Sequence, residues 1–179
     1  LVEAAGFTYF VAYDGTWEVL WRTDGTAAGT AMVVPPGPGQ PHFIGSIVSV
    51  GTKVFFTATT PATGYELWVS DGTAAGTQLI DTYPGPEGSN PAALTTADDL
   101  LYFTAFNQAG RTLWRTDGTQ QGTVAISYFA AGAGTIGSMG RFARGLIFGF
   151  EPFASSLGQE PWFTDGTIAG TVPLGDLHP

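Results

Sequence analysis

A few spaced carboxylates are the side chains in this 179-residue sequence that could carry acid–base chemistry. Two carboxyl groups flanking a glycosidic bond are the machinery of glycoside hydrolysis. Glu151 and Glu160 flank one long loop segment, and Glu18 and Glu66 lie at similar places in two repeats. Neither spacing is specific to catalysis. We therefore interpret all four glutamates as charged, outward-facing residues beside strands.

The two histidines, His42 and His178, have no spaced partner for catalysis. The sequence contains no G-x-S-x-G, H-E-x-x-H or P-loop pattern that would give them one. We therefore predict a protein that is not an enzyme and has no catalytic residues. A glycoside hydrolase or lyase stays the third alternative.

One aspartate recurs in each of four similar turns, at Asp24, Asp71, Asp117 and Asp165. Oxygen ligands from several such turns could surround a calcium ion. An EF-type loop, however, carries several acidic residues at alternate positions, and each of these turns carries one. The sequence predicts no metal site and no cofactor, with calcium kept as the alternative.

Aromatic side chains near loops could provide a platform for a sugar ring. Trp17 lies outside the repeated pattern, and Tyr13 and Tyr65 lie close to expected loops. These three are the candidate ligand-binding residues of a carbohydrate-binding, lectin-like alternative.

The sequence contains a stretch that is repeated four times. The stretch "WRTDGTAAGT" at 21–30 returns as "WVSDGTAAGT" at 68–77, "WRTDGTQQGT" at 114–123 and "WFTDGTIAGT" at 162–171. The tryptophans at 21, 68, 114 and 162 are 47, 46 and 48 residues apart. A period of this length is typical of a four-stranded propeller blade.

Each repeat contains four segments of strand composition and no helical periodicity. In the third repeat they are 90–97, 100–107, 111–117 and 122–129. We predict an all-β, four-bladed β-propeller with four antiparallel strands per blade, as a single domain over 1–179. The predicted blades are 1–37, 38–86, 87–133 and 134–179. We expect the ring to close within one chain; half of an eight-bladed ring of two chains, or a piece of a longer array, are the alternatives.

The repeated turn is interpreted as structural. The aspartate accepts hydrogen bonds from backbone N–H groups ahead of it, the glycine takes a positive φ, and the threonine closes the loop through its hydroxyl. The tryptophan ends the third strand, where its ring can cover the joint between blades. The structural turn residues are Trp21, Asp24, Gly25, Thr26, Trp68, Asp71, Gly72, Thr73, Trp114, Asp117, Gly118, Thr119, Trp162, Asp165, Gly166 and Thr167. Asp14 and Gly15 predict a separate two-residue hairpin turn.

Composition excludes several classes of partner. The net charge of −9, from 6 basic and 15 acidic residues, opposes binding to nucleic acid and to anionic lipid. No apolar run approaches the roughly 20 residues that span a bilayer, so no membrane insertion is expected. The chain has no cysteine, and it opens at "LVEAAG" without a basic leader, as a mature or excised segment would.

The stretch "YELWVSDGTAAGT" in the second repeat resembles the signature of ELWxxDGT repeat proteins, a bacterial family of tandem β-propeller-type repeats. The other repeats read "VLW", "TLW" and "EPW" before the shared W-x-x-D-G-T-x-x-G-T pattern. The resemblance implies a large secreted or surface-associated bacterial protein and no particular activity.

The function predicted from the sequence is a non-catalytic structural or interaction module, extracellular or on the cell surface. Only 12% of the residues are charged, and fourth strands such as "TAMVV" and "TVAISYF" would offer apolar edges to a neighbour. We expect self-association into a ring, tube or filament. The predicted partners are further copies of the chain or other surface proteins, with glycans as the alternative.

Overall fold

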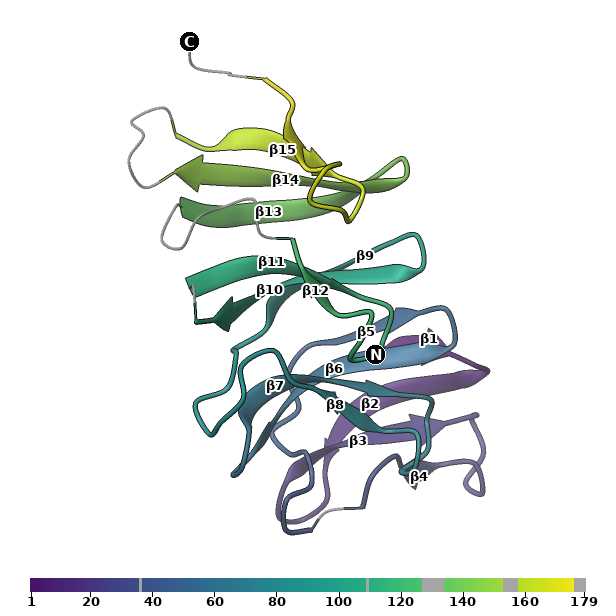
Figure 1. Cartoon of the computed structure of the whole chain (residues 1–179). Helices are drawn as coiled ribbons and strands as arrows, with labels where there is room; N and C mark the ends of the chain where they lie inside the picture. The colour runs from purple at the N-terminus through teal and green to yellow at the C-terminus, as the bar shows by residue number, and fades with distance from the viewer. Residues whose placement is uncertain (36, 109, 127–133, 153–157, 176–179) are drawn as a thin grey trace. The chain divides into compact units, whose positions relative to one another are not determined.

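The computed structural model describes residues 1–35, 37–108, 110–126, 134–152 and 158–175, which form strands and turns (Figure 1). These ranges contain no helix, and hence no helix of membrane-spanning length. The chain divides into two compact units, Leu1–Pro91 (unit 1) and Ala92–Pro179 (unit 2). Each unit is described by itself.

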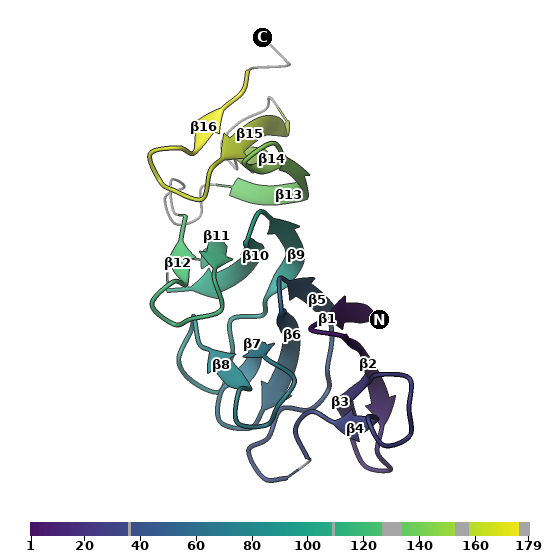
Figure 2. The ribbon, with the colours of Figure 1, turned by 90° about the vertical axis from the view of Figure 1, so that its right-hand side faces the viewer.

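Unit 1 consists of two four-stranded antiparallel meanders, which we call blade 1 and blade 2 (Figure 1, Figure 2). The strands of blade 1 are β1 (Val2–Ala4), β2 (Phe7–Tyr13), β3 (Glu18–Thr23) and β4 (Ala31–Met32). Those of blade 2 are β5 (Ile47–Val50), β6 (Lys53–Thr60), β7 (Gly64–Ser70) and β8 (Gln78–Ile80).

Unit 2 repeats this arrangement as blade 3 and blade 4. The strands of blade 3 are β9 (Ala92–Ala97), β10 (Leu100–Asn107), β11 (Gly110–Thr116) and β12 (Val124–Ala125). Those of blade 4 are β13 (Gly134–Phe142), β14 (Gly145–Pro152), β15 (Glu160–Thr164) and β16 (Val172–Pro173). The predicted fold class, four propeller blades of four antiparallel strands, is confirmed.

The fourth strands are shorter than the six to eight residues that the sequence predicts. Strands β4, β12 and β16 have two residues each, and β8 has three. Each pairs with the third strand of its blade just after the repeated turn and then ends. The last part of the expected strand in blade 3, 127–129, lies outside the described residues. Short edge strands leave little unpaired backbone for another chain to pair with.

The central strands keep the same register in every blade. The repeat tryptophan faces a phenylalanine across the sheet in the pairs Phe10↔Trp21, Phe56↔Trp68, Phe103↔Trp114 and Phe148↔Trp162. Because side chains alternate along a strand, each blade has a face with this pair, which we call its Trp face, and an opposite face.

The core of each unit lies between its two blades. In unit 1, Tyr9 and Leu20 on the opposite face of blade 1 form one apolar cluster with Phe56 and Ala58 on the Trp face of blade 2. In unit 2, Tyr102 and Leu113 of blade 3 form the same kind of cluster with Phe148 and other residues of blade 4. Both units therefore pack in the same way. The Trp face of the second blade lies on the opposite face of the first blade.

Candidate functional site

The repeated turn is held by hydrogen bonds that recur in every copy. In blade 2, Asp71 Oδ1 accepts from Thr73 N at 2.9 Å and from Thr73 Oγ1 at 2.7 Å. Gly76 N then donates to Thr73 Oγ1 at 3.0 Å. The turns of Asp24, Asp117 and Asp165 repeat these three bonds. The bonds from threonine hold the pKa of Asp24, Asp71 and Asp165 below the usual value, the hydroxyl bond most strongly.

Two further hydroxyls of the turn were not predicted from the sequence. Thr77 Oγ1 donates to Thr73 O at 2.7 Å, so its proton is engaged. Ser70 Oγ, 2.8 Å away, must therefore donate to Thr77 Oγ1 while it accepts from Gly72 N at 3.0 Å. The equivalent pairs are Thr23 with Thr30, Thr116 with Thr123 and Thr164 with Thr171. The hydroxyl before each aspartate and the last threonine thus close the loop.

The two glycines of the turn have different roles. The first has a φ of 91° at Gly25, 92° at Gly72, 90° at Gly118 and 89° at Gly166, in the left-handed region that favours glycine. The second has no room for a side chain, since a Cβ on Gly76 would lie 2.1 Å from Asp71 Oδ1. Alanine at either place would disturb the turn, for different reasons.

Within each unit, the turn of the second blade is also the joint to the first blade. A Cβ on Gly72 would lie 2.2 Å from the Tyr9 hydroxyl and 3.2 Å from Arg22 Nη1. Tyr9 and Arg22 are cross-strand partners on β2 and β3. Unit 2 repeats the joint, since a Cβ on Gly166 would lie 2.7 Å from the Tyr102 hydroxyl and 2.8 Å from Arg115 Cδ. Burial raises the pKa of Tyr9 and of Tyr102, against the opposing charge of their arginines.

In the second blade of each unit, the repeat tryptophan lies at the predicted joint with the first blade. Trp68 packs against the cluster between blades 1 and 2, and Trp162 against the cluster between blades 3 and 4. Trp21 and Trp114 stack on their cross-strand phenylalanines at 6.4 Å and 6.3 Å between ring centroids. Sequence reasoning did not single out the Tyr–Arg pairs that complete these joints.

Glu66 is not the outward-facing residue that the sequence predicts. Its side chain is 0% exposed, and its two carboxylate oxygens accept from Ser89 N at 2.7 Å and Ser89 Oγ at 2.5 Å. Asn90 N donates to Tyr65 O at 3.1 Å in the same contact. Burial raises the pKa of Glu66 to about 7; the bonds from Ser89 oppose this rise, and the charge of Asp81 adds to it. The "ELW" glutamate therefore clamps the connector that leaves blade 2.

The remaining candidates for catalysis lie in both units, Glu18 on β3 of unit 1 and Glu151 and Glu160 on β14 and β15 of unit 2. Glu18 and Glu151 are exposed, and Glu160 lies on β15 opposite Phe150. His178 lies outside the described residues. Among the residues that the structure describes, no three His, Asp or Glu side chains come together as metal ligands.

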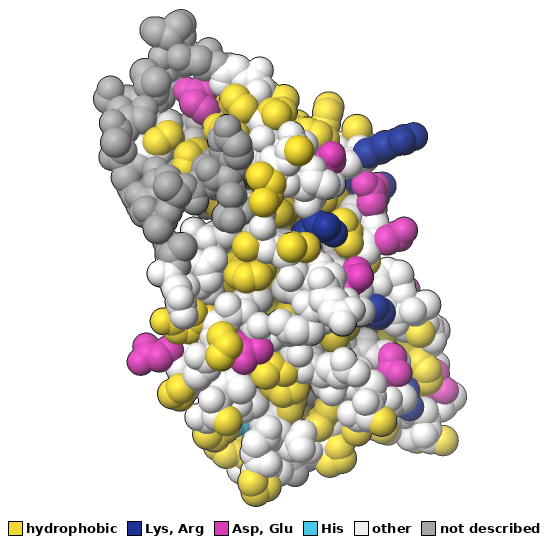
Figure 3. Space-filling model, viewed as in Figure 1, with side chains coloured by type: hydrophobic (Ala, Val, Ile, Leu, Met, Phe, Trp, Pro, Cys, Tyr) yellow, Lys and Arg dark blue, Asp and Glu magenta, His cyan; other side chains and the backbone are white. Residues whose placement is uncertain are grey.

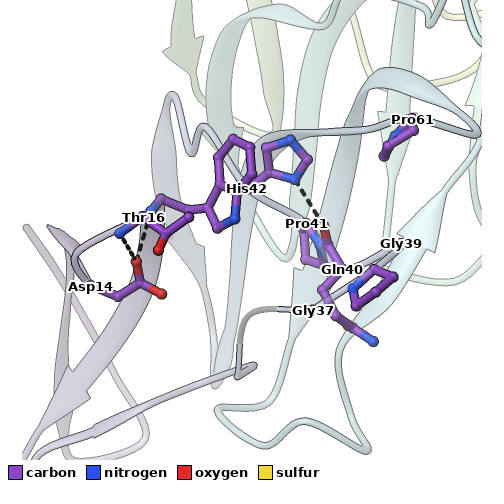
Figure 4. A pocket seen from close by; sticks show the side chains of 10 residues that line it. Asp14, Thr16, Gly37, Gly39, Gln40, Pro41, His42 and Pro61 are labelled. Carbon is purple, nitrogen blue, oxygen red and sulfur yellow. Dashed lines mark hydrogen bonds between the residues drawn. The ribbon is translucent and has the colours of Figure 1, made fainter.

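One cavity of about 510 Å³ collects polar and aromatic groups in unit 1 (Figure 4). It lies between the β2–β3 loop of blade 1 and the connector to blade 2. Its walls are Asp14, Thr16, Trp17, Gly37, Pro38, Gly39, Gln40, Pro41, His42 and Pro61. The Trp17 ring lies 4.4 Å from the ring of His42, centroid to centroid.

The other two aromatic candidates lie elsewhere. Tyr13, 67% exposed, is the last residue of β2 and is not part of the cavity wall. Tyr65 is half-buried in blade 2, with its hydroxyl 2.5 Å from Thr57 Oγ1. Only Trp17 of the three lines the cavity.

Comparison with known proteins supports the fold and goes no further. No family model matches the sequence, and no curated protein matches it. Among solved structures, the β-propeller domain of the trilobed protease from Pyrococcus furiosus, described with an open velcro topology, aligns at a TM-score of 0.59 and 14% identity over 97% of this chain. TolB from Acinetobacter baumannii aligns at a TM-score of 0.53 and 15% identity over 94% of this chain. The chain spans 52% of the first structure and 41% of the second. In its fold, the chain is a set of four β-propeller blades.

Proposed function

We propose that this chain is a non-catalytic propeller module of a bacterial extracellular or cell-surface protein, and that it self-associates through the Trp face of blade 1. The observation that carries the proposal is a difference in exposure between equivalent residues. Phe56 and Phe148 are 1% and 0% exposed, whereas Phe10, at the same position in blade 1, remains partly exposed. Within unit 1, no blade packs on this face.

The composition of the surface supports the same proposal. On the face shown in Figure 3, uncharged side chains cover most of the surface, and several charged side chains lie close together along its right-hand side. The apolar side chains exposed on unit 2 include Ile168, Val172 and Leu174. A surface with few charges opposes close association only weakly.

The proposed contact is between blade faces and not between strand edges. The sequence analysis placed it on the outer fourth strands, but strands of two or three residues offer little backbone for pairing. Inside each unit, by contrast, one blade packs face to face on the next. The Trp face of blade 1 differs from that of blade 2 at one end, where Thr8 stands at the position of Val54. This end is therefore less apolar than in blade 2.

The occupant that we propose is blade 4 of a second copy. On the opposite face of blade 4, Ile147 and Phe163 are partly exposed. They stand at the positions of Tyr9 and Arg22, the residues on which the blade 2 turn rests. Such a contact joins different surfaces of two copies, so repetition closes a ring or extends a filament.

The test is the mass of the native chain, measured by light scattering and native mass spectrometry. We expect a multiple of 18.7 kDa. Ala12→Arg puts a charged side chain beside Phe10 on the free face and is expected to yield monomers with an unchanged circular dichroism spectrum. Ala27→Arg, at an exposed turn position, is the matched control and should keep the wild-type mass.

A wild-type monomer of 18.7 kDa at high concentration would refute self-association and would instead fit closure within one chain. An Ala12→Arg variant that assembles like the wild type would show that another surface makes the contact.

A further inference from the structure

We propose that the cavity between residues 14–17 and 37–42 of unit 1 binds a neutral saccharide. This inference is independent of the assembly face of blade 1. The cavity volume of about 510 Å³ lies within the range of about 300–1,000 Å³ that is common for small-molecule sites.

One wall of the cavity is aromatic and rigid. Besides the contact with His42, the Trp17 ring meets Phe43 edge to face at 5.3 Å. Phe43 is 53% exposed and has a φ of 52°, which is unusual for a bulky side chain. Pro38, Pro41 and Pro61, whose rings fix the backbone φ, also line the cavity, together with Gly37 and Gly39.

The connection between β2 and β3 positions a carboxylate at the cavity. It is a four-residue loop, 14–17, and not the predicted two-residue turn. Asp14 Oδ1 accepts from Thr16 N and Trp17 N, both at 2.7 Å, and Asp14 N donates to Trp17 O (Figure 4). The bonds from Trp17 and then Thr16 hold the pKa of Asp14 below its usual value, so the carboxylate stays charged at neutral pH.

Hydrogen-bonding groups without a partner among the described residues remain around this carboxylate. They are Asp14 Oδ2, the Thr16 hydroxyl and the Gln40 carboxamide. His42 Nδ1 lies 3.1 Å from Gln40 O, and because a carbonyl only accepts, Nδ1 carries the proton. In the neutral ring, Nε2 is then a further acceptor.

This set of groups selects the class of ligand. A carboxylate and an imidazole nitrogen need a ligand rich in hydrogen-bond donors, and sugar hydroxyls are such donors. A proline-rich peptide also suits aromatic walls, but proline has no N–H and would leave both acceptors unsatisfied. The net charge of −9 and the absence of Lys and Arg from the walls disfavour an anionic ligand. A neutral hexose, with its C–H face on Trp17 and its hydroxyls toward Asp14 and Gln40, satisfies both kinds of wall.

The test uses the full chain on an array of neutral oligosaccharides that end in glucose, galactose, mannose or N-acetylglucosamine. The affinity for the strongest of these is then measured by calorimetry. We expect Trp17→Ala and Gln40→Ala each to weaken binding by about tenfold or more, through the aromatic wall and through the carboxamide. Tyr13→Ala removes an exposed aromatic residue next to this loop and outside the cavity wall, and should bind like the wild type.

Circular dichroism of each variant separates loss of the site from loss of the fold. Because Gln40 is exposed, its truncation tests the site even if Trp17→Ala fails to fold. No binding to any of the four neutral termini would overturn the proposal, as would equal losses in Tyr13→Ala and Gln40→Ala. Binding of a deca-proline peptide in place of the sugars would assign the cavity to a different class of ligand and would also overturn it.

Discussion

Gly72→Ala is expected to lower the free energy of unfolding by about 2–4 kcal/mol, whereas Gly25→Ala, in the same turn of blade 1, should cost about 1 kcal/mol. The two glycines share their sequence context and have φ values of 92° and 91°. Their surroundings differ, because a Cβ on Gly72 would meet the Tyr9 hydroxyl at 2.2 Å, and a Cβ on Gly25 would meet nothing within 4 Å. The difference between the two losses therefore measures the joint between blades 1 and 2.

The measurement is urea unfolding of the whole chain, followed by tryptophan fluorescence. A Tyr9→Phe background removes the atom that the new methyl group would strike. In that background, the cost of Gly72→Ala should fall toward the cost of Gly25→Ala, which a double-mutant cycle reports directly. Equal costs of Gly72→Ala with and without the Tyr9 hydroxyl would contradict the joint described for unit 1.

Glu66 is expected to make the chain less stable as the pH rises from about 5 to about 7. The pKa of its carboxyl is about 7 in the fold, above the ordinary value of 4.5. Between these values the folded chain holds more protons than the unfolded chain, so the free energy of unfolding falls as the pH rises. The full shift corresponds to about 3 kcal/mol, of which about 2 kcal/mol falls between pH 5 and pH 7.

Two variants separate the charge of Glu66 from its role as a clamp. Glu66→Gln keeps an acceptor for Ser89 and cannot ionise, so it should lack this slope and be more stable than the wild type at pH 8. Glu66→Ala removes both acceptors and leaves a cavity, and should cost about 2–4 kcal/mol.

The measurement is the free energy of unfolding of the wild type and both variants between pH 5 and pH 8. Asp24, Asp71 and Asp165, whose pKa values are held below the usual value, titrate below this window and are common to all three proteins, so their contribution cancels. Parallel pH profiles for Glu66→Gln and the wild type would contradict the raised pKa of Glu66.

The repeated turn could be read from the sequence because its interactions are local. Asp71, Thr73 and Gly76 bond one another within six residues, so the order of the residue types already determines which donor meets which acceptor. The strands were predictable for a related reason, because alternation with a period of two specifies which residues share a face.

The prediction for Glu66 was wrong because its deciding partner lies far along the chain. Glu66 has the composition and spacing of an outward-facing strand residue, but Ser89, 23 residues later, buries it. The fourth strands also end after two or three residues, although the sequence predicts six to eight. Their composition did not show where pairing with the third strand ends.

By itself, the sequence determined four blades and their shared turn, because hydrogen bonds and alternation within one repeat suffice for these. Only the tertiary structure decided that Gly72 is covered and Gly25 open, that Glu66 is a clamp, and that Trp17 meets His42 across a cavity. The physical reason is that burial and desolvation depend on which segments pack together, and equivalent residues of a repeat can differ completely in what covers them.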